Sequence, residues 1–107
     1  MSDAYIYVPD LREAAKSVEN KIHKQVLQDD DRTRVILFAF AAGQELAAHT
    51  APFPATLTFL KGEAVVRLGD DELHAGEGAF AYMPANLLHG IKAETDAVML
   101  LTIAKNR

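Results

Sequence analysis

The sequence contains no cysteine, so disulfide bonds, thiolate catalysis and zinc–thiolate sites are all excluded. It also lacks a long apolar run, since no stretch approaches the roughly 20 residues that a membrane-spanning helix needs. The first residues have neither the basic segment nor the apolar segment of a signal peptide. We therefore expect a cytoplasmic protein with no membrane partner.

Clustered positive charge is missing as well. The 107 residues include 11 Lys and Arg against 15 Asp and Glu, for a formal net charge of −4, and the cations are spread along the chain. A nucleic-acid-binding surface needs concentrated positive charge, so we expect no nucleic-acid partner. A chain of this length fits one domain. We predict a single domain over residues 1–107, with an N-terminal arm over 1–32 and a core over 33–104.

Beyond residue 34 the pattern is that of short β-strands. Runs of β-branched and aromatic residues, such as Val35–Phe40, are separated by turn signals. Thr56–Phe59 alternates polar with apolar residues, as a strand with one buried face does. Such spacing is typical of an antiparallel sandwich or barrel, so we predict an all-β fold. The expected strands cover residues 35–40, 56–59, 64–68, 79–83 and 97–103.

The first third of the chain is compatible with either helix or strand. Apolar residues recur at helical spacing from Leu11 to Val26, and Asp10 could cap a helix that begins there. Residues 22–27 suit a strand equally well, because so short a stretch has no decisive period. We predict a short helical turn near residues 10–17, followed by a strand.

Two of the expected strands, 35–40 and 97–103, are apolar on both faces. A half-exposed antiparallel strand should instead alternate, so something must cover their second face. Either the N-terminal segment or a second subunit could do so. We predict a homodimer formed by packing of these sheets.

A first motif surrounds one histidine. Gly43, His49 and Gly62 match a pattern of glycine, five residues, His-x-His, three or four residues, Glu, six residues and glycine. Ala51 stands where this pattern has its second histidine, and Ala55 stands where it has its glutamate.

A second motif surrounds another histidine. Gly78, Pro84 and His89 match a pattern of glycine, five residues, Pro-x-Gly, two residues, His, three residues and Asn. Asn86 replaces the glycine, which is a mild change because Asn tolerates left-handed backbone better than most residues. Ala93 replaces the final asparagine. With both motifs in this order on a predicted all-β chain, the sequence resembles the cupin family.

The resemblance implies a double-stranded β-helix, or jelly-roll barrel. In the family, the His-x-His pair, the glutamate and the last histidine bind a divalent metal inside the barrel. This chain keeps the first and last of these ligands, His49 and His89, which implies an incomplete metal site and no certain cofactor. A transition metal such as Zn, Ni, Cu, Fe or Mn could still bind weakly, because imidazole is a good ligand for these ions.

Three further residues are expected to face the pocket. Leu57 and Phe59 share the face of Ala55, because all three are separated by two positions, and Tyr82 could add a hydroxyl from the next strand. Ordinary core packing explains Leu57 and Phe59 equally well.

Other titratable groups have structural explanations. His23 lies between lysines and His74 lies out of phase with an apolar neighbour, so both are expected at the surface. Asp29–Asp31 lacks the alternating ligand frame of a calcium loop and predicts a solvated turn.

These features favour a small-molecule-binding cupin whose barrel pocket carries His49 and His89, with no catalytic residue assigned. The alternative is a metal-dependent cupin enzyme of the dioxygenase, isomerase or decarboxylase type, in which the same residues would act as ligand or base. A third possibility is a structural domain whose pocket is filled by side chains. The fold alone does not choose among them.

Overall fold

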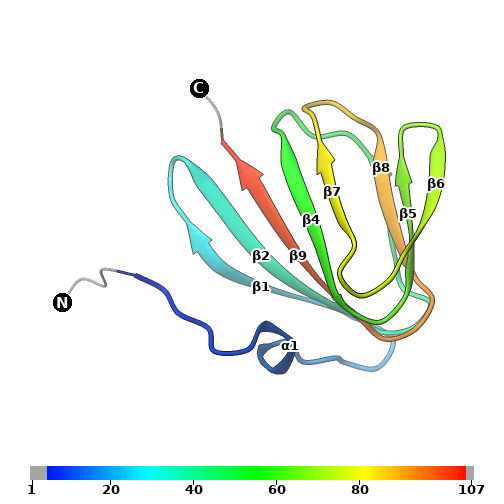
Figure 1. The fold of residues 1–107 in the computed structure, drawn as a ribbon, viewed down its shortest axis with the longest axis horizontal. Helices are drawn as coiled ribbons and strands as arrows, with labels where there is room; N and C mark the ends of the chain where they lie inside the picture. The colour runs from blue at the N-terminus through cyan, green and yellow to red at the C-terminus, as the bar shows by residue number, and fades with distance from the viewer. Residues whose placement is uncertain (1–4, 106–107) are drawn as a thin grey trace.

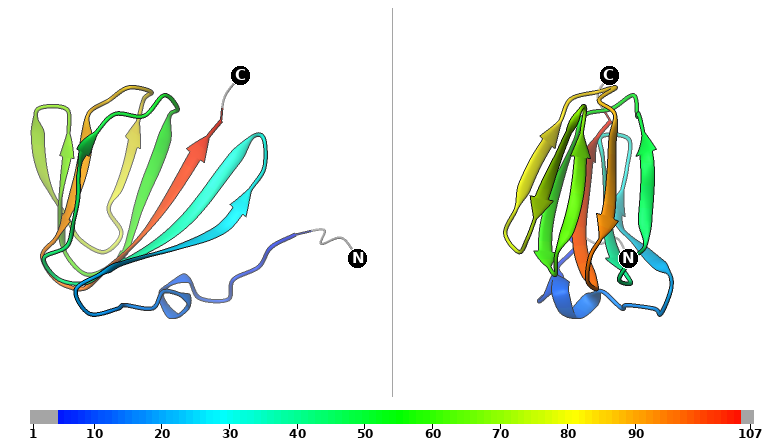
Figure 2. Two further views of the ribbon diagram at one scale, coloured as in Figure 1. Left: turned by 180° about the vertical axis from the view of Figure 1, so that it is seen from behind. Right: turned by 90° about the vertical axis from the view of Figure 1, so that its right-hand side faces the viewer.

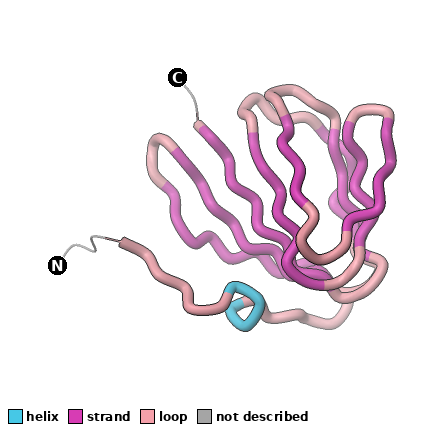
Figure 3. Tube along the Cα trace, in the orientation of Figure 1, coloured by secondary structure: helices cyan, strands magenta, loops and turns pink. Residues whose placement is uncertain are grey.

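The structure, a computed structural model, describes residues 5–105 (Figure 1). Within this range it contains one short helix and nine strands, and Figure 3 shows how little of the chain is helical. The helix is α1 (Leu11–Ala14), and the strands are β1 (Ile22–Asp29), β2 (Thr33–Phe40), β3 (Glu45–His49), β4 (Ala55–Lys61), β5 (Ala64–Leu68), β6 (Asp71–Ala75), β7 (Phe80–Met83), β8 (His89–Ala93) and β9 (Ala97–Ala104). No helix among the described residues is long and apolar enough to span a bilayer.

The strands form two antiparallel sheets, which confirms the predicted all-β jelly roll. One sheet has the order β1-β2-β9-β4-β7 and the other has the order β3-β8-β5-β6. In Figure 1 the strands lie close together at the bottom of the view and spread apart toward the top, with β1, β2 and β9 on the left and β8, β5 and β6 on the right, and Figure 2 shows the same strands from two other sides. The sequence signals did not predict β3, β6 and β8, because these strands consist mainly of alanine, glycine and charged residues, which have low β-propensity.

The first third of the chain contains both elements that were predicted there. Asp10 caps α1, because its carboxylate accepts a hydrogen bond of 3.0 Å from the backbone N–H of Arg12. The helix is a single turn and is shorter than the predicted range. β1 then pairs antiparallel with β2, with an irregularity between Val26 and Gln28.

The core lies between the two sheets. Alternate residues of each strand point inward and pack together, and this alternation explains why Phe38 and Phe40 stack with ring centroids 5.9 Å apart. Burying such side chains is the main driving force for the fold. The most deeply buried large side chains are Phe40, Leu57 and Met99 in this core, and Leu37 on the opposite face of β2.

The outer face of the five-stranded sheet is partly covered by the N-terminal segment. An apolar groove lies between this segment and the sheet, with Ile6, Val8 and Leu11 on one side and Val35 and Leu100 on the other. The N-terminal segment therefore covers part of the second face of β2 and β9. Tyr5 and Tyr7 remain largely exposed on it. The homodimer stays a prediction.

Candidate functional site

Strands β3 and β8 place the two motif histidines opposite each other. His49, the last residue of β3, pairs directly with His89, the first residue of β8. Their ring centroids are 4.4 Å apart and the rings are tilted by 56°. The fold therefore brings together the two metal-motif histidines that this chain retains.

Glycine at position 90 allows this close approach. A Cβ added to Gly90 would lie 3.1 Å from both the N and the Cα of Ala48 and 3.1 Å from the carbonyl oxygen of Leu46. The pairing of β3 with β8 is irregular in this stretch, between Leu46 and His49. A larger residue at position 90 would push β3 away, so Gly90 is a positioning residue that the motif spacing did not reveal.

Both imidazole rings are held in the same tautomer. Nδ1 of His49 lies 3.1 Å from the carbonyl oxygen of Ala47, and Nδ1 of His89 lies 2.9 Å from that of Leu87. A carbonyl oxygen only accepts hydrogen bonds, so each Nδ1 must carry a proton. In the neutral ring, Nε2 is then an unprotonated acceptor. The fold thus presents two Nε2 lone pairs from adjacent strands.

The two histidines line a small cavity between the sheets. Its volume is about 120 Å³, and apart from the histidines its walls are apolar. The loops before β4 and β8 contribute to its wall, and they are joined where the backbone N–H of Asn86 donates to the carbonyl oxygen of Ala51 at 2.7 Å. Asn86 has a φ of 71°, the left-handed conformation that its motif position demands. The cavity is lined by His49, Ala51, Phe53, Ala55, Met83, Pro84, Leu87, His89, Leu101 and Ile103.

Comparison with known proteins agrees with this geometry. A sequence profile of the cupin domain matches residues 36–104, which is more than half of the chain. The chain belongs to the cupin family. No curated protein sequence is significantly similar to it.

Several solved structures resemble this cupin over nearly its whole length. A conserved protein of unknown function from Streptococcus pyogenes, SPY1581, is 25% identical, with 100% of this chain and 92% of that chain covered and a TM-score of 0.88. TT1209 from Thermus thermophilus is 29% identical, with coverages of 91% and 95% and a TM-score of 0.83. A cupin superfamily protein from Desulfitobacterium hafniense is 23% identical, with coverages of 96% and 100% and a TM-score of 0.88, and it supports the fold.

Three residues expected at the pocket lie outside its lining. Leu57 and Phe59 do share the inner face with Ala55, but they lie deeper and are 1% and 2% exposed as part of the core. Tyr82 is 59% exposed, because strand alternation turns it outward while its neighbour Met83 points into the cavity. Core packing therefore explains the first two residues, and Tyr82 contributes no hydroxyl to the cavity.

Part of the lining was not predicted from the sequence. Leu101 and Ile103 come from β9, whose residues are apolar on both faces, so periodicity did not show which of them point inward. Leu87 lies in the loop between the second-motif residues Pro84 and His89. Its position within the second motif was the sequence feature that could have predicted its place in the lining.

The donor set of this cavity does not fit a tightly bound transition metal. Ala51 and Ala55 line the cavity at the two other ligand positions of the motif and offer no donor atom. Within residues 5–105, no group of three or more His, Cys, Asp or Glu residues is placed to hold one ion. Catalytic zinc typically has three protein ligands, and two neutral imidazoles leave the charge of a dication uncompensated.

The two other histidines lie elsewhere. His74 is exposed on β6, where its Nε2 lies 2.5 Å from Oε1 of Glu63 and its Nδ1 lies 3.5 Å from Oε1 of Glu94. His23, on β1, is partly buried and pairs with Ala39. Neither lines the cavity.

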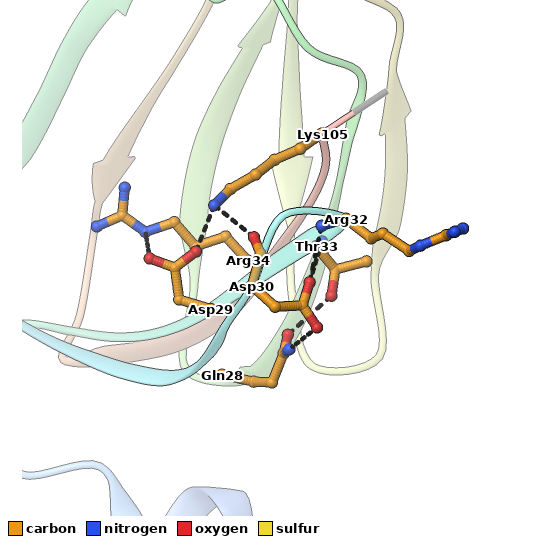
Figure 4. Close-up of polar contacts among 7 residues, drawn as sticks. All are labelled: Gln28, Asp29, Asp30, Arg32, Thr33, Arg34 and Lys105. Carbon is orange, nitrogen blue, oxygen red and sulfur yellow. Dashed lines mark hydrogen bonds and ion pairs between the residues drawn. The ribbon is translucent and has the colours of Figure 1, made fainter. Parts of the chain in front are cut away.

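The turn between β1 and β2 forms a polar cluster at the open end of the five-stranded sheet (Figure 4). The carboxylate of Asp30 accepts hydrogen bonds from the backbone N–H groups of Arg32 at 2.8 Å and Thr33 at 2.9 Å, and from the side chain of Gln28 at 2.7 Å. The backbone bonds from Thr33 and then Arg32 lower the pKa of Asp30, with smaller contributions from Gln28 and Lys105. The predicted solvated turn is confirmed, and its carboxylate organises the loop.

Replacing Asp30 by asparagine is expected to lower the melting temperature more at pH 7 than near pH 2. The pKa of Asp30 is lowered from 3.8 in the folded state, so its contribution to stability is present above that value. It is lost as the pH falls through the folded-state pKa. Thermal unfolding at both pH values checks this, with Asp31→Asn as the control on the same turn. An equal loss at both pH values would contradict it.

Proposed function

We propose that this cupin binds a small molecule in the cavity between its sheets, with His49 and His89 as the polar contacts. The observation that carries the proposal is the paired orientation of the rings, each with Nδ1 directed at a backbone carbonyl. Ligand sites typically combine apolar walls with a few fixed polar groups, and this cavity has that composition.

The ligand must be small. Sites for drug-sized molecules have volumes of roughly 300–1,000 Å³, whereas this cavity has about 120 Å³. Two neutral imidazoles accept hydrogen bonds from a hydroxyl or amide group of the ligand. When one ring is protonated, its Nε2 becomes a donor, and the pair then offers one donor and one acceptor. The pair can therefore also hold, or exchange a proton with, an acidic group.

The second candidate is a metal-dependent enzyme of the dioxygenase, isomerase or decarboxylase type. It is favoured by one feature: metal-binding histidines usually donate their other ring N–H to a carbonyl or carboxylate, as both rings do here. The lack of a third donor among the described residues counts against it. This candidate predicts that metal binds and that both histidines are needed for binding.

The test is a titration followed by NMR of the histidine side chains. The probes are short-chain alcohols, carboxylic acids and primary amides of three to six carbons. We expect at least one class to shift the ring signals of both His49 and His89. Changing either residue to alanine should weaken binding roughly 3- to 10-fold, the value of one hydrogen bond.

His23→Ala is the matched control, because it removes a histidine that does not line the cavity. Binding that is unaffected by His49→Ala and His89→Ala, or weakened equally by His23→Ala, would contradict the proposal.

A further inference from the structure

A cation lies beside the wall of the cavity. Arg34 on β2 pairs directly with Ile103 on β9, which in turn pairs with Ala55 on β4. Directly paired residues point to the same face of a sheet, with Cβ atoms about 5 Å apart. Both Ile103 and Ala55 line the cavity. Arg34 therefore lies on the inner face of the sheet, one strand beyond the cavity wall.

The carboxylates near Arg34 are already engaged. Asp29 forms ion pairs with both Lys105 and Arg34, but its Oδ2 lies 3.7 Å from Nε of Arg34, which is too far for a hydrogen bond (Figure 4). Asp30 accepts from the loop backbone and from Gln28. Within residues 5–105, the buried Nε of Arg34 has no hydrogen-bond partner. The fold thus leaves a guanidinium group incompletely satisfied.

Arg34 lies in a cluster of balanced charge. Arg32, Arg34 and Lys105 carry three positive charges here, and Asp29, Asp30 and Asp31 carry three negative charges. Apart from the two histidines, no titratable residue lines the cavity. A ligand that extends from the cavity along the inner face toward β2 approaches Arg34, which pairs with the lining residue Ile103.

We propose that the ligand of this cavity is a small carboxylic acid whose carboxylate is bound by Arg34. The inference rests on the proposed function and names its ligand class. The planar guanidinium matches a carboxylate in geometry as well as in charge. The carbon chain of the acid contacts Ile103 and Leu101, and a hydroxyl group, where the acid has one, donates to an Nε2 of the histidine pair.

The experiment compares acids with their neutral analogues. Straight-chain and branched carboxylates of three to six carbons, with and without a hydroxyl group, are each titrated against the primary amide of the same skeleton at pH 7. The protein samples are the wild type, Arg34→Gln and Arg32→Gln. Arg32→Gln is the matched control because it makes the same charge change two residues away on the exposed turn.

In the wild type, at least one acid is expected to bind roughly 10- to 100-fold more tightly than its amide, the usual value of hydrogen bonds to a charged group. Arg34→Gln should abolish this preference while the amide still binds, and Arg32→Gln should retain it. Thermal unfolding checks that each variant is folded. Arg34→Met, which keeps the length of the side chain, replaces Arg34→Gln if that variant is unfolded.

Two results would overturn the proposal in different ways. If acid and amide bind equally well and shift the His49 and His89 ring signals, or if the preference survives Arg34→Gln, the cavity binds ligands but Arg34 does not select acids. If neither class of probe shifts those signals, the proposed function fails together with the inference.

Discussion

Introducing both missing motif ligands, as Ala51→His with Ala55→Glu, is expected to raise the affinity for nickel or zinc by about four orders of magnitude. Ala51 and Ala55 line the same cavity as His49 and His89. A four-ligand zinc site binds with roughly 10–16 kcal/mol, or about 3 kcal/mol per ligand, so two added ligands contribute about 6 kcal/mol. The added glutamate also supplies the negative charge that offsets the ion.

Isothermal titration with each metal measures this gain. The matched control is Ala48→His with Thr56→Glu, which adds the same side chains outside the cavity lining. If the control variant gained as much affinity as the cavity variant, or if neither gained any, the two alanines would not converge with the histidines on one point.

Replacing Gly62 by alanine is expected to destabilise the fold by about 2–5 kcal/mol. Gly62 has a φ of 80°, and a Cβ there would lie 2.1 Å from the carbonyl oxygen of Asp96 and 2.9 Å from the Cα of Ala97. Both contacts are with backbone atoms, so the turn before β9 must move. The left-handed conformation alone costs about 1–2 kcal/mol, and forced displacement of packed structure adds about 1–3 kcal/mol.

Gly43 provides the matched control for this substitution. It has a similar φ of 86°, but a Cβ there meets no atom within 4 Å. Gly43→Ala should therefore cost only the conformational term of about 1–2 kcal/mol. Denaturant unfolding of both variants measures the difference. Equal losses would show that the contact with the turn before β9 is unimportant. Both glycines belong to the first motif, but only at Gly62 would a Cβ clash with neighbouring backbone atoms.

Much of the fold could be predicted from the sequence, because strands such as β4 alternate clearly between polar and apolar residues. Strands β3 and β8 could not, since their residues have little β-propensity and pair only through tertiary context, with Gly90 allowing the approach. The spacing of apolar residues in the first third of the chain was compatible with either helix or strand. The pairing of β1 with β2 makes residues 22–29 a strand, and such pairing cannot be read from local spacing.

The candidate site was predicted in part. The motif spacing identified His49 and His89, and the structure places them in direct contact. Tyr82 was misplaced because the phase of a four-residue strand depends on its neighbours, and the register with β4 turns Tyr82 outward. Sequence spacing does not reveal the carbonyl contacts that fix the histidine tautomers. It also does not reveal that Arg34 lies beside the cavity wall, because both features depend on strand pairing.

We propose that the histidine pair serves a small-molecule pocket and not a tightly bound metal. The most direct test is the metal content of untagged wild-type protein, measured by elemental mass spectrometry before and after incubation with nickel, copper, zinc, iron and manganese. We expect well below one equivalent of any metal after gel filtration, with no change in His49→Ala or His89→Ala. Near-stoichiometric metal that disappears in both variants would contradict it and would favour the metal-dependent enzyme.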